Sequence, residues 1–176
     1  MKTNTKASTK HIALIALFIA LSFIGANIRI FGSIAFDSLP AFLAALLLGP
    51  LYGAIIGFIG HLLTALMSGF PLSVPLHLVI AVAMAITMLG FGFTFRALKK
   101  RMRLSGSLAI TGIVGVLLNG PVSLGFSMGT LALMAGAEAA LGLIALLPFL
   151  MLASVINVVA SIVLFKALER IWDKFK

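Results

Sequence analysis

The fold of this chain is decided by the stretch Arg96-Ala97-Leu98-Lys99-Lys100-Arg101-Met102-Arg103. It places five positive charges between two long apolar runs. Lys and Arg residues beside membrane spans stay on the cytoplasmic side, so the stretch predicts a cytoplasmic loop. The number of spans on either side of it must fit that placement.

The rest of the positive charge lies almost wholly at the two ends of the chain, and only Arg29 lies elsewhere. The terminal basic residues are Lys2, Lys6, Lys10, Lys166, Arg170, Lys174 and Lys176. By the same rule both termini are expected in the cytoplasm. An even number of spans must therefore both precede and follow residues 96–103.

The composition is that of a membrane protein. The chain is 62% hydrophobic and 10% charged, whereas soluble domains carry about 25% charged residues. Its 176 residues suffice for one membrane domain, 1–176. The net charge of +9 would suggest nucleic acid as the partner of a soluble protein, but here it marks the cytoplasmic face and contact with anionic lipid. The absence of cysteine excludes disulfides, iron–sulfur clusters and thiolate sites.

Six apolar runs have helical length, and they are 11–31, 38–48, 50–67, 76–97, 107–132 and 140–168. The second and third are separated only by Gly49-Pro50, so an alternative interpretation is that 38–67 forms one long kinked helix. One fused helix would give five spans and place 96–103 outside, whereas two helices put every basic stretch inside. The sequence therefore predicts an all-α integral membrane protein with six transmembrane helices. The run 38–48 is short for a span and is expected to be tilted or partly re-entrant. The first run exceeds the apolar region of a signal peptide and is expected to be an uncleaved span.

Polar side chains inside apolar spans are costly and usually functional. Most of them fall toward the outer half of the predicted topology, where they are candidates for binding a substrate. These are Asn27, Arg29, Asp37, His61, His77, Asn119, Ser123 and Asn157. The alternative for each is a hydrogen bond between helices, and for Arg29 and Asp37 a mutual ion pair. The outer loop 68–75 is expected to cap the cavity, with Phe70 covering the apolar body of the ligand.

Two runs of small residues permit close helix packing. Ala13, Ala16 and Ala20 share one face of the first helix, and Gly49, Gly53, Gly57 and Gly60 share one face of the third. Either face could pack inside the chain or against a partner subunit, and spacing alone does not choose.

Two motifs suggest catalysis only at first sight. Residues 125–129 match the nucleophile pattern G-x-S-x-G, but they lie inside a span with no histidine downstream. His61 and His77 form a weak metal site without cysteine or a nearby inward carboxylate. The chain also lacks a P-loop. We therefore expect no enzyme activity, no metal and no cofactor.

Three segments carry a resemblance to a known family. They are Ala35-Phe36-Asp37-Ser38-Leu39-Pro40-Ala41-Phe42, Leu48-Gly49-Pro50-Leu51-Tyr52-Gly53-Ala54 and Gly60-His61-Leu62-Leu63. Together they resemble the substrate-binding S components of energy-coupling factor (ECF) transporters. The resemblance implies a binder of a vitamin or similar micronutrient in a prokaryotic cell membrane. It also implies a transmembrane coupling subunit and two cytoplasmic ATPases as partners, with no nucleic acid. Ala16 and Ala20 look like the family's A-x-x-x-A motif, which contacts the coupling subunit.

The resemblance extends to a subgroup of the family. The segments Gly60-His61-Leu62-Leu63 and Phe70-Pro71-Leu72 look most like members assigned to cobalamin precursors such as α-ribazole. Nickel and cobalt are not expected, because metal-specific relatives have His after the initiator Met and this chain has Lys2. The alternatives are a stand-alone transporter or channel for a small polar solute and, less favoured, an intramembrane enzyme.

Overall fold

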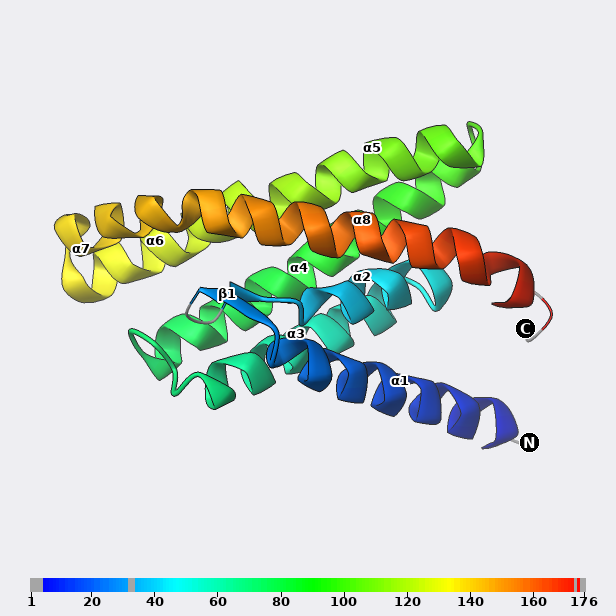
Figure 1. Ribbon diagram of the computed structural model, residues 1–176, viewed down its shortest axis with the longest axis horizontal. Coiled ribbons are helices and arrows are strands. Elements are labelled where there is room, and N and C mark those ends of the chain that lie inside the picture. The colour runs from blue at the N-terminus through cyan, green and yellow to red at the C-terminus, as the bar shows by residue number, and fades with distance from the viewer. Residues whose placement is uncertain (1–4, 32–33, 173, 175–176) are drawn as a thin grey trace.

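The structure is a computed structural model that describes residues 5–31, 34–172 and 174. It is a bundle of helices with one small two-stranded ribbon (Figure 1). The elements are α1 (Thr5–Ala26), β1 (Arg29–Phe31), β2 (Ile34–Ala35), α2 (Ser38–Leu47), α3 (Pro50–Met67), α4 (Val74–Lys99), α5 (Leu104–Leu117), the π-helix η1 (Leu118–Val122), α6 (Ser123–Ala135), α7 (Ala137–Gly142), the 3₁₀ helix η2 (Leu143–Leu146) and α8 (Leu147–Trp172). Apart from the ribbon, the predicted all-helical class is confirmed.

Five helical segments are long and apolar enough to cross a membrane. Within the described residues they are Thr9–Ala26, Pro50–Met67, Val74–Lys99, Leu104–Ala135 and Ala137–Trp172. The second of the six predicted spans, 38–48, corresponds to α2, which is apolar but has only 10 residues. At about 1.5 Å per residue this helix is roughly 15 Å long, half of the hydrocarbon core that a span must cross.

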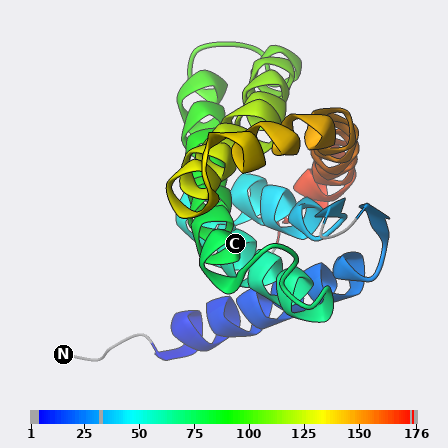
Figure 2. The ribbon, with the colours of Figure 1, turned by 90° about the vertical axis from the view of Figure 1, so that its left-hand side faces the viewer.

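The short helix α2 forms the centre of the bundle. Nine of its residues are buried, and Phe42 meets Phe91 of α4 edge to face with ring centroids 4.8 Å apart. Viewed along the bundle, α2 lies between α1, α3, α4 and α8 (Figure 2). A segment enclosed by protein needs no lipid contact, so its length is not fixed by the bilayer.

The break between α2 and α3 confirms the two-helix interpretation of 38–67, and the single kinked helix is wrong. Gly49 has φ 121°, a conformation that other residues rarely adopt, and Pro50 opens α3. The carbonyl groups that end α2 receive hydrogen bonds from other helices. Trp172 Nε1 donates to the Leu47 oxygen at 3.1 Å, and the Arg96 guanidinium donates to the Leu48 oxygen at 3.3 Å.

The basic stretches gather at one end of the bundle. The start of α1, the α2–α3 turn, the α4–α5 connection and the end of α8 all lie at the right-hand end of Figure 1. Five long segments and the short α2 thus alternate in direction, as the charge pattern requires.

The segment after α1 differs from the prediction, which extended an apolar helical run to residue 31. The helix ends at Ala26, and β1 pairs antiparallel with β2. The residues there include Ile28, Ile30 and Ile34, and β-branched side chains favour strands over helices. A run of apolar residues without a helical period cannot by itself separate the two.

The glycine face of α3 packs inside the chain, which resolves one alternative left open by the sequence. A methyl group at Gly53 would lie 2.6 Å from the Ala45 Cβ atom, and one at Gly60 would lie 3.0 Å from the Ser22 Cβ atom. These contacts hold α3 close to α2 and α1. The alanine face of α1 is different, because Ala13, Ala16 and Ala20 are all exposed.

Candidate functional site

A cavity of about 690 Å³ lies in the half of the bundle away from the basic stretches. It is enclosed by the start of α2, the second half of α3, the loop before α4, the first half of α4, and the segments from η1 to α8. Its volume falls within the range of about 300–1,000 Å³ that is usual for small-molecule sites. It is therefore the candidate site.

The lining of the cavity has an apolar part and a polar part. Leucines and alanines from α6, α7, η2 and α8 supply most of the apolar lining. The polar lining consists of Asp37, Ser38, His61, His77, Asn119, Ser123, Ser127, Ser154 and Asn157. Among the described residues no Lys or Arg lines the cavity. An anionic group would therefore find hydrogen-bond donors there and no fixed cation from the described residues.

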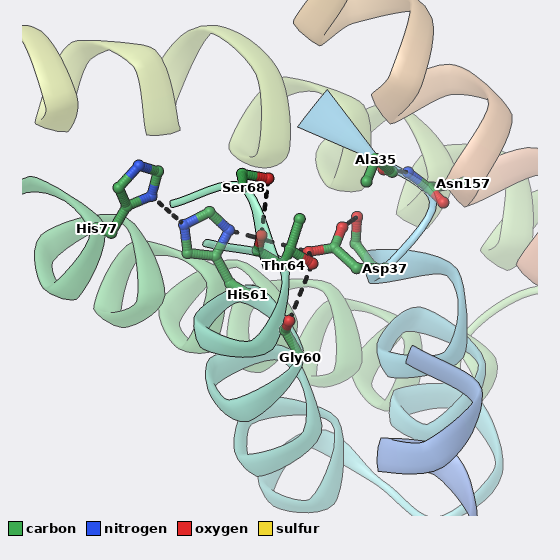
Figure 3. Close-up of polar contacts among 9 residues, drawn as sticks. Ala35, Asp37, Gly60, His61, Thr64, Ser68, His77 and Asn157 are labelled. Atoms are coloured by element: carbon green, nitrogen blue, oxygen red, sulfur yellow. Dashed lines mark hydrogen bonds and ion pairs between the residues drawn. The ribbon is translucent and has the colours of Figure 1, made fainter. Parts of the chain in front are cut away.

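Asp37, His61 and His77 form one continuous series of polar contacts (Figure 3). Thr64 Oγ1 lies 2.6 Å from Asp37 Oδ2 and 3.1 Å from the Gly60 oxygen. His61 Nδ1 lies 3.9 Å from the same Asp37 oxygen. The other His61 ring nitrogen is 3.1 Å from His77 Nδ1, and His77 Nε2 is 2.9 Å from the Pro71 oxygen. The ring nitrogens of both histidines are thus directed at groups of the protein itself.

The series of polar contacts ends in the loop between α3 and α4, residues 68–73. This loop closes one side of the cavity. Pro71 and Leu72 line the cavity, and Leu72 has φ 74°. Phe70 does not line it; its ring instead packs edge-on against His77 with centroids 5.9 Å apart. The loop lies over the cavity as predicted, but the residue expected to cover the ligand supports His77 instead.

Asn157 presents an unpaired acceptor at this site. Its Nδ2 donates to the Ala35 oxygen at 3.2 Å, while Oδ1 is buried with no hydrogen-bond partner within the described part of the chain. A buried polar atom without a partner costs about 1–3 kcal/mol. Because Asn157 lines the cavity, a donor on a ligand would remove that cost.

The π-helix η1 places a second amide at the cavity. The motif Asn119-Gly120-Pro121 interrupts the α5–α6 helix, because Pro121 cannot donate to the preceding turn. Asn119 Nδ2 donates to Ser154 Oγ on α8 at 3.0 Å. Such bulges frequently occur at functional sites, and this one directs Asn119 and Ser123 to the lining.

Most of the polar residues singled out in the sequence meet at the cavity. The structure brings together Asp37, His61, His77, Asn119, Ser123 and Asn157. Asn27 is exposed and donates to the Phe23 oxygen at the end of α1. The side chain of Arg29 lies outside the described part of the structure, and so does the ion pair considered for it.

Four small polar residues of the site were missed by sequence reasoning. They are Ser38, Thr64, Ser127 and Ser154. Helical spacing offered a signal for two of them, since Thr64 lies three residues after His61 and Ser154 three before Asn157. Residues at that spacing share a helix face.

The two motifs set aside in the sequence have structural explanations. Ser127, in the G-x-S-x-G match, donates its hydroxyl to the Ser123 oxygen one turn earlier at 2.9 Å. The expectation that no carboxylate lies near His61 is wrong, because Asp37 Oδ2 is 3.9 Å from its Nδ1 atom. The described residues nevertheless contain no group of three or more His, Cys, Asp or Glu that could hold a metal ion.

Three comparisons with known proteins give a structural match, no curated match and a family match. Among solved structures, the S component of a bacterial ECF transporter superimposes with a TM-score of 0.63 at 21% sequence identity, over 93% of this chain and 98% of the other. At that identity the likeness shows the fold alone. No curated protein matches this chain. The family model for the ECF transporter substrate-specific component matches residues 10–169, which is nearly the whole chain. The chain therefore belongs to the family of ECF transporter substrate-specific components.

Proposed function

We propose that this protein binds a vitamin precursor for import, and that its ligand is α-ribazole or a related corrinoid precursor. Membership of the family makes the chain a membrane-embedded substrate-binding subunit rather than an enzyme. The observation that carries the choice of ligand class is the cavity, which joins a polar lining, with no Lys or Arg among its described residues, to an apolar wall.

The chemistry of the cavity favours a largely uncharged ligand with an apolar or aromatic body. Asn119, Ser123 and Asn157 offer hydrogen bonds on the polar side, and leucines of α6 to α8 offer apolar contact. A nucleoside-like compound presents both chemistries, with sugar hydroxyls at one end and a flat base at the other. An organic anion is disfavoured because no fixed cation lines the described cavity.

The proposal includes an orientation in the membrane. The basic end of the bundle, with Lys10, Lys99, Lys100 and Arg170, faces the cytoplasm by the positive-inside rule. The cavity then lies toward the outer face, where a ligand would arrive. The membrane is the cell membrane of a prokaryote, which is the setting that the family resemblance implies.

Uptake requires partners in this proposal. Ala16 and Ala20 form an exposed small-residue face on α1, and such faces let helices approach closely in lipid. We assign this face to a transmembrane coupling subunit, which works with two cytoplasmic ATPases.

Titration of the purified protein tests the ligand. We expect saturable, one-to-one binding of α-ribazole and much weaker binding of anionic vitamins such as folate, because the described cavity offers no fixed cation. Calorimetry in detergent measures both. Tight binding of folate that survives Asn119→Ala would refute the ligand class and the site together.

A further inference from the structure

The series of polar contacts from Gly60 to Pro71 lacks a hydrogen at one contact, between Asp37 and His61, if every group has its ordinary charge. Both of its ends are backbone carbonyl oxygens, which only accept. Between them stand Thr64, Asp37, His61 and His77, all of them buried. The positions of the hydrogens can therefore be worked out from the two ends inward.

The loop end fixes both histidine tautomers. His77 Nε2 must donate to the Pro71 oxygen, so the Nδ1 atom of a neutral His77 is an acceptor. The hydrogen in the 3.1 Å contact between the two rings must then come from His61 Nε2. A neutral His61 is left with a bare Nδ1 atom, which faces Asp37 Oδ2 at 3.9 Å.

A bare ring nitrogen and a carboxylate oxygen repel each other in a buried site. Their side chains are only 7% and 6% exposed, so water screens them little. The other contacts of Asp37 do have hydrogens, since Thr64 donates to Oδ2 at 2.6 Å and Ser38 donates to Oδ1 at 3.5 Å, so the unmet contact is the one with His61. One additional proton, on Asp37 or on His61, removes the repulsion.

We propose that Asp37 and His61 together hold a single proton, on one group or the other, which leaves the polar end of the cavity without net charge and holds the loop 68–73 over the ligand through His77 and Pro71. The effect of the proton on ligand binding rests on the proposed function. Its effect on the position of loop 68–73 is a property of the ligand-free protein and does not depend on which ligand binds. Asp37 acts here as a positioning residue for the loop.

The surroundings of Asp37 agree with a shared proton. Burial raises the pKa of the Asp37 carboxyl to about 6. The described titratable side chain that faces it is His61 of α3, with its Nδ1 atom 3.9 Å from Asp37 Oδ2, and the next titratable group is His77 of α4. The elements α1 and α8 contribute the neutral Ser22 and Asn157 near this end, and the Arg29 side chain is outside the described part.

The sign of the pH dependence follows from the proton count. Above the pH at which the pair loses its proton, the site is negatively charged, and binding must take up one proton. Affinity then falls about tenfold for each pH unit. The pH at which this begins belongs to the coupled pair rather than to either residue.

The test compares Asp37→Asn with Asp37→Ala, using His11→Gln as the control. The amide of Asn carries its own hydrogens, so it can replace the shared proton, whereas Ala cannot. His11 is an exposed histidine on α1 that stacks on Tyr52, away from the cavity. Titration with α-ribazole from about pH 5 to about pH 9 gives the dissociation constants. Hydrogen exchange of the segment 68–73, in ligand-free protein at one pH, reports the loop.

We expect wild-type protein and H11Q to lose affinity at the alkaline end, and D37N to bind within about tenfold of wild type at neutral pH without that loss. D37A should bind about a hundredfold more weakly and exchange faster in the loop. The proposal is overturned if wild-type affinity is flat across the range, if D37N keeps the alkaline loss, or if D37N is as weak as D37A. Loop exchange that is equal in D37A and wild type also overturns it. Failure of wild-type protein to bind α-ribazole, with faster exchange in D37A alone, would instead refute the ligand and leave the shared proton standing.

Discussion

Tryptophan at position 20 is expected to abolish uptake while leaving ligand binding by the isolated protein intact. Ala20 is exposed on α1 and shares a face with Ala16 one turn earlier. The side chain does not pack in the chain's own core, so a large ring there does not disturb the cavity. In a complex, the same ring would hold a partner helix away from the small-residue face.

The control for this substitution is Val163→Trp on α8. Val163 is 59% exposed on another helix, so the added ring faces lipid in both proteins. Uptake in cells carrying the transporter partners and ligand titration of purified protein are the two readouts, and co-purification with the coupling subunit is a third. Loss of ligand binding in A20W would show that the face is internal, and normal uptake would place the docking surface elsewhere.

Asn157→Ala is expected to weaken ligand binding by about ten- to a hundredfold. Within the described residues, the Asn157 Oδ1 atom is a buried acceptor at the cavity without a hydrogen-bond partner, and a donor on the ligand would satisfy it. Loss of such a bond in a buried site costs about 1–3 kcal/mol, and each 1.4 kcal/mol is about tenfold in affinity. The substitution also releases the Ala35 oxygen, to which Asn157 donates, and so loosens the segment that leads into α2.

Ser161→Ala provides the matched comparison on the same helix. Ser161 is buried one turn beyond Asn157, bonds to the Val158 oxygen at 2.7 Å and does not line the cavity. We expect its affinity to match wild type in calorimetric titration. Equal losses in both variants would trace the effect to helix α8 as a whole rather than to a contact with the ligand.

The helical order was predictable because its signals are local. Charge at 96–103 required an even number of preceding spans, and Gly49-Pro50 supplied the break. The ribbon of β1 and β2 was not predictable in this way. Its five residues are too few for a periodic pattern. The pairing also depends on a contact distant in the sequence, because Ala35 of β2 accepts a hydrogen bond from Asn157 of α8.

Most of the polar residues that line the site were predictable, but the hydrogen bonds between them were not. Asp37, His61 and Asn157 stood out because polar groups in apolar runs are costly. Their partners did not, since Thr64 and Ser154 are common small residues that matter only because folding brings them within hydrogen-bond distance. The sequence likewise could not show that His61 and His77 bond to each other from different helices.

Uptake into proteoliposomes tests the central claim most directly. The purified chain is reconstituted with a coupling subunit and two ATPases, and labelled α-ribazole is offered from the side that carries the cavity. We predict accumulation that requires ATP, the partner proteins and this chain together. Accumulation by this chain alone without ATP would contradict the account and indicate a stand-alone transporter.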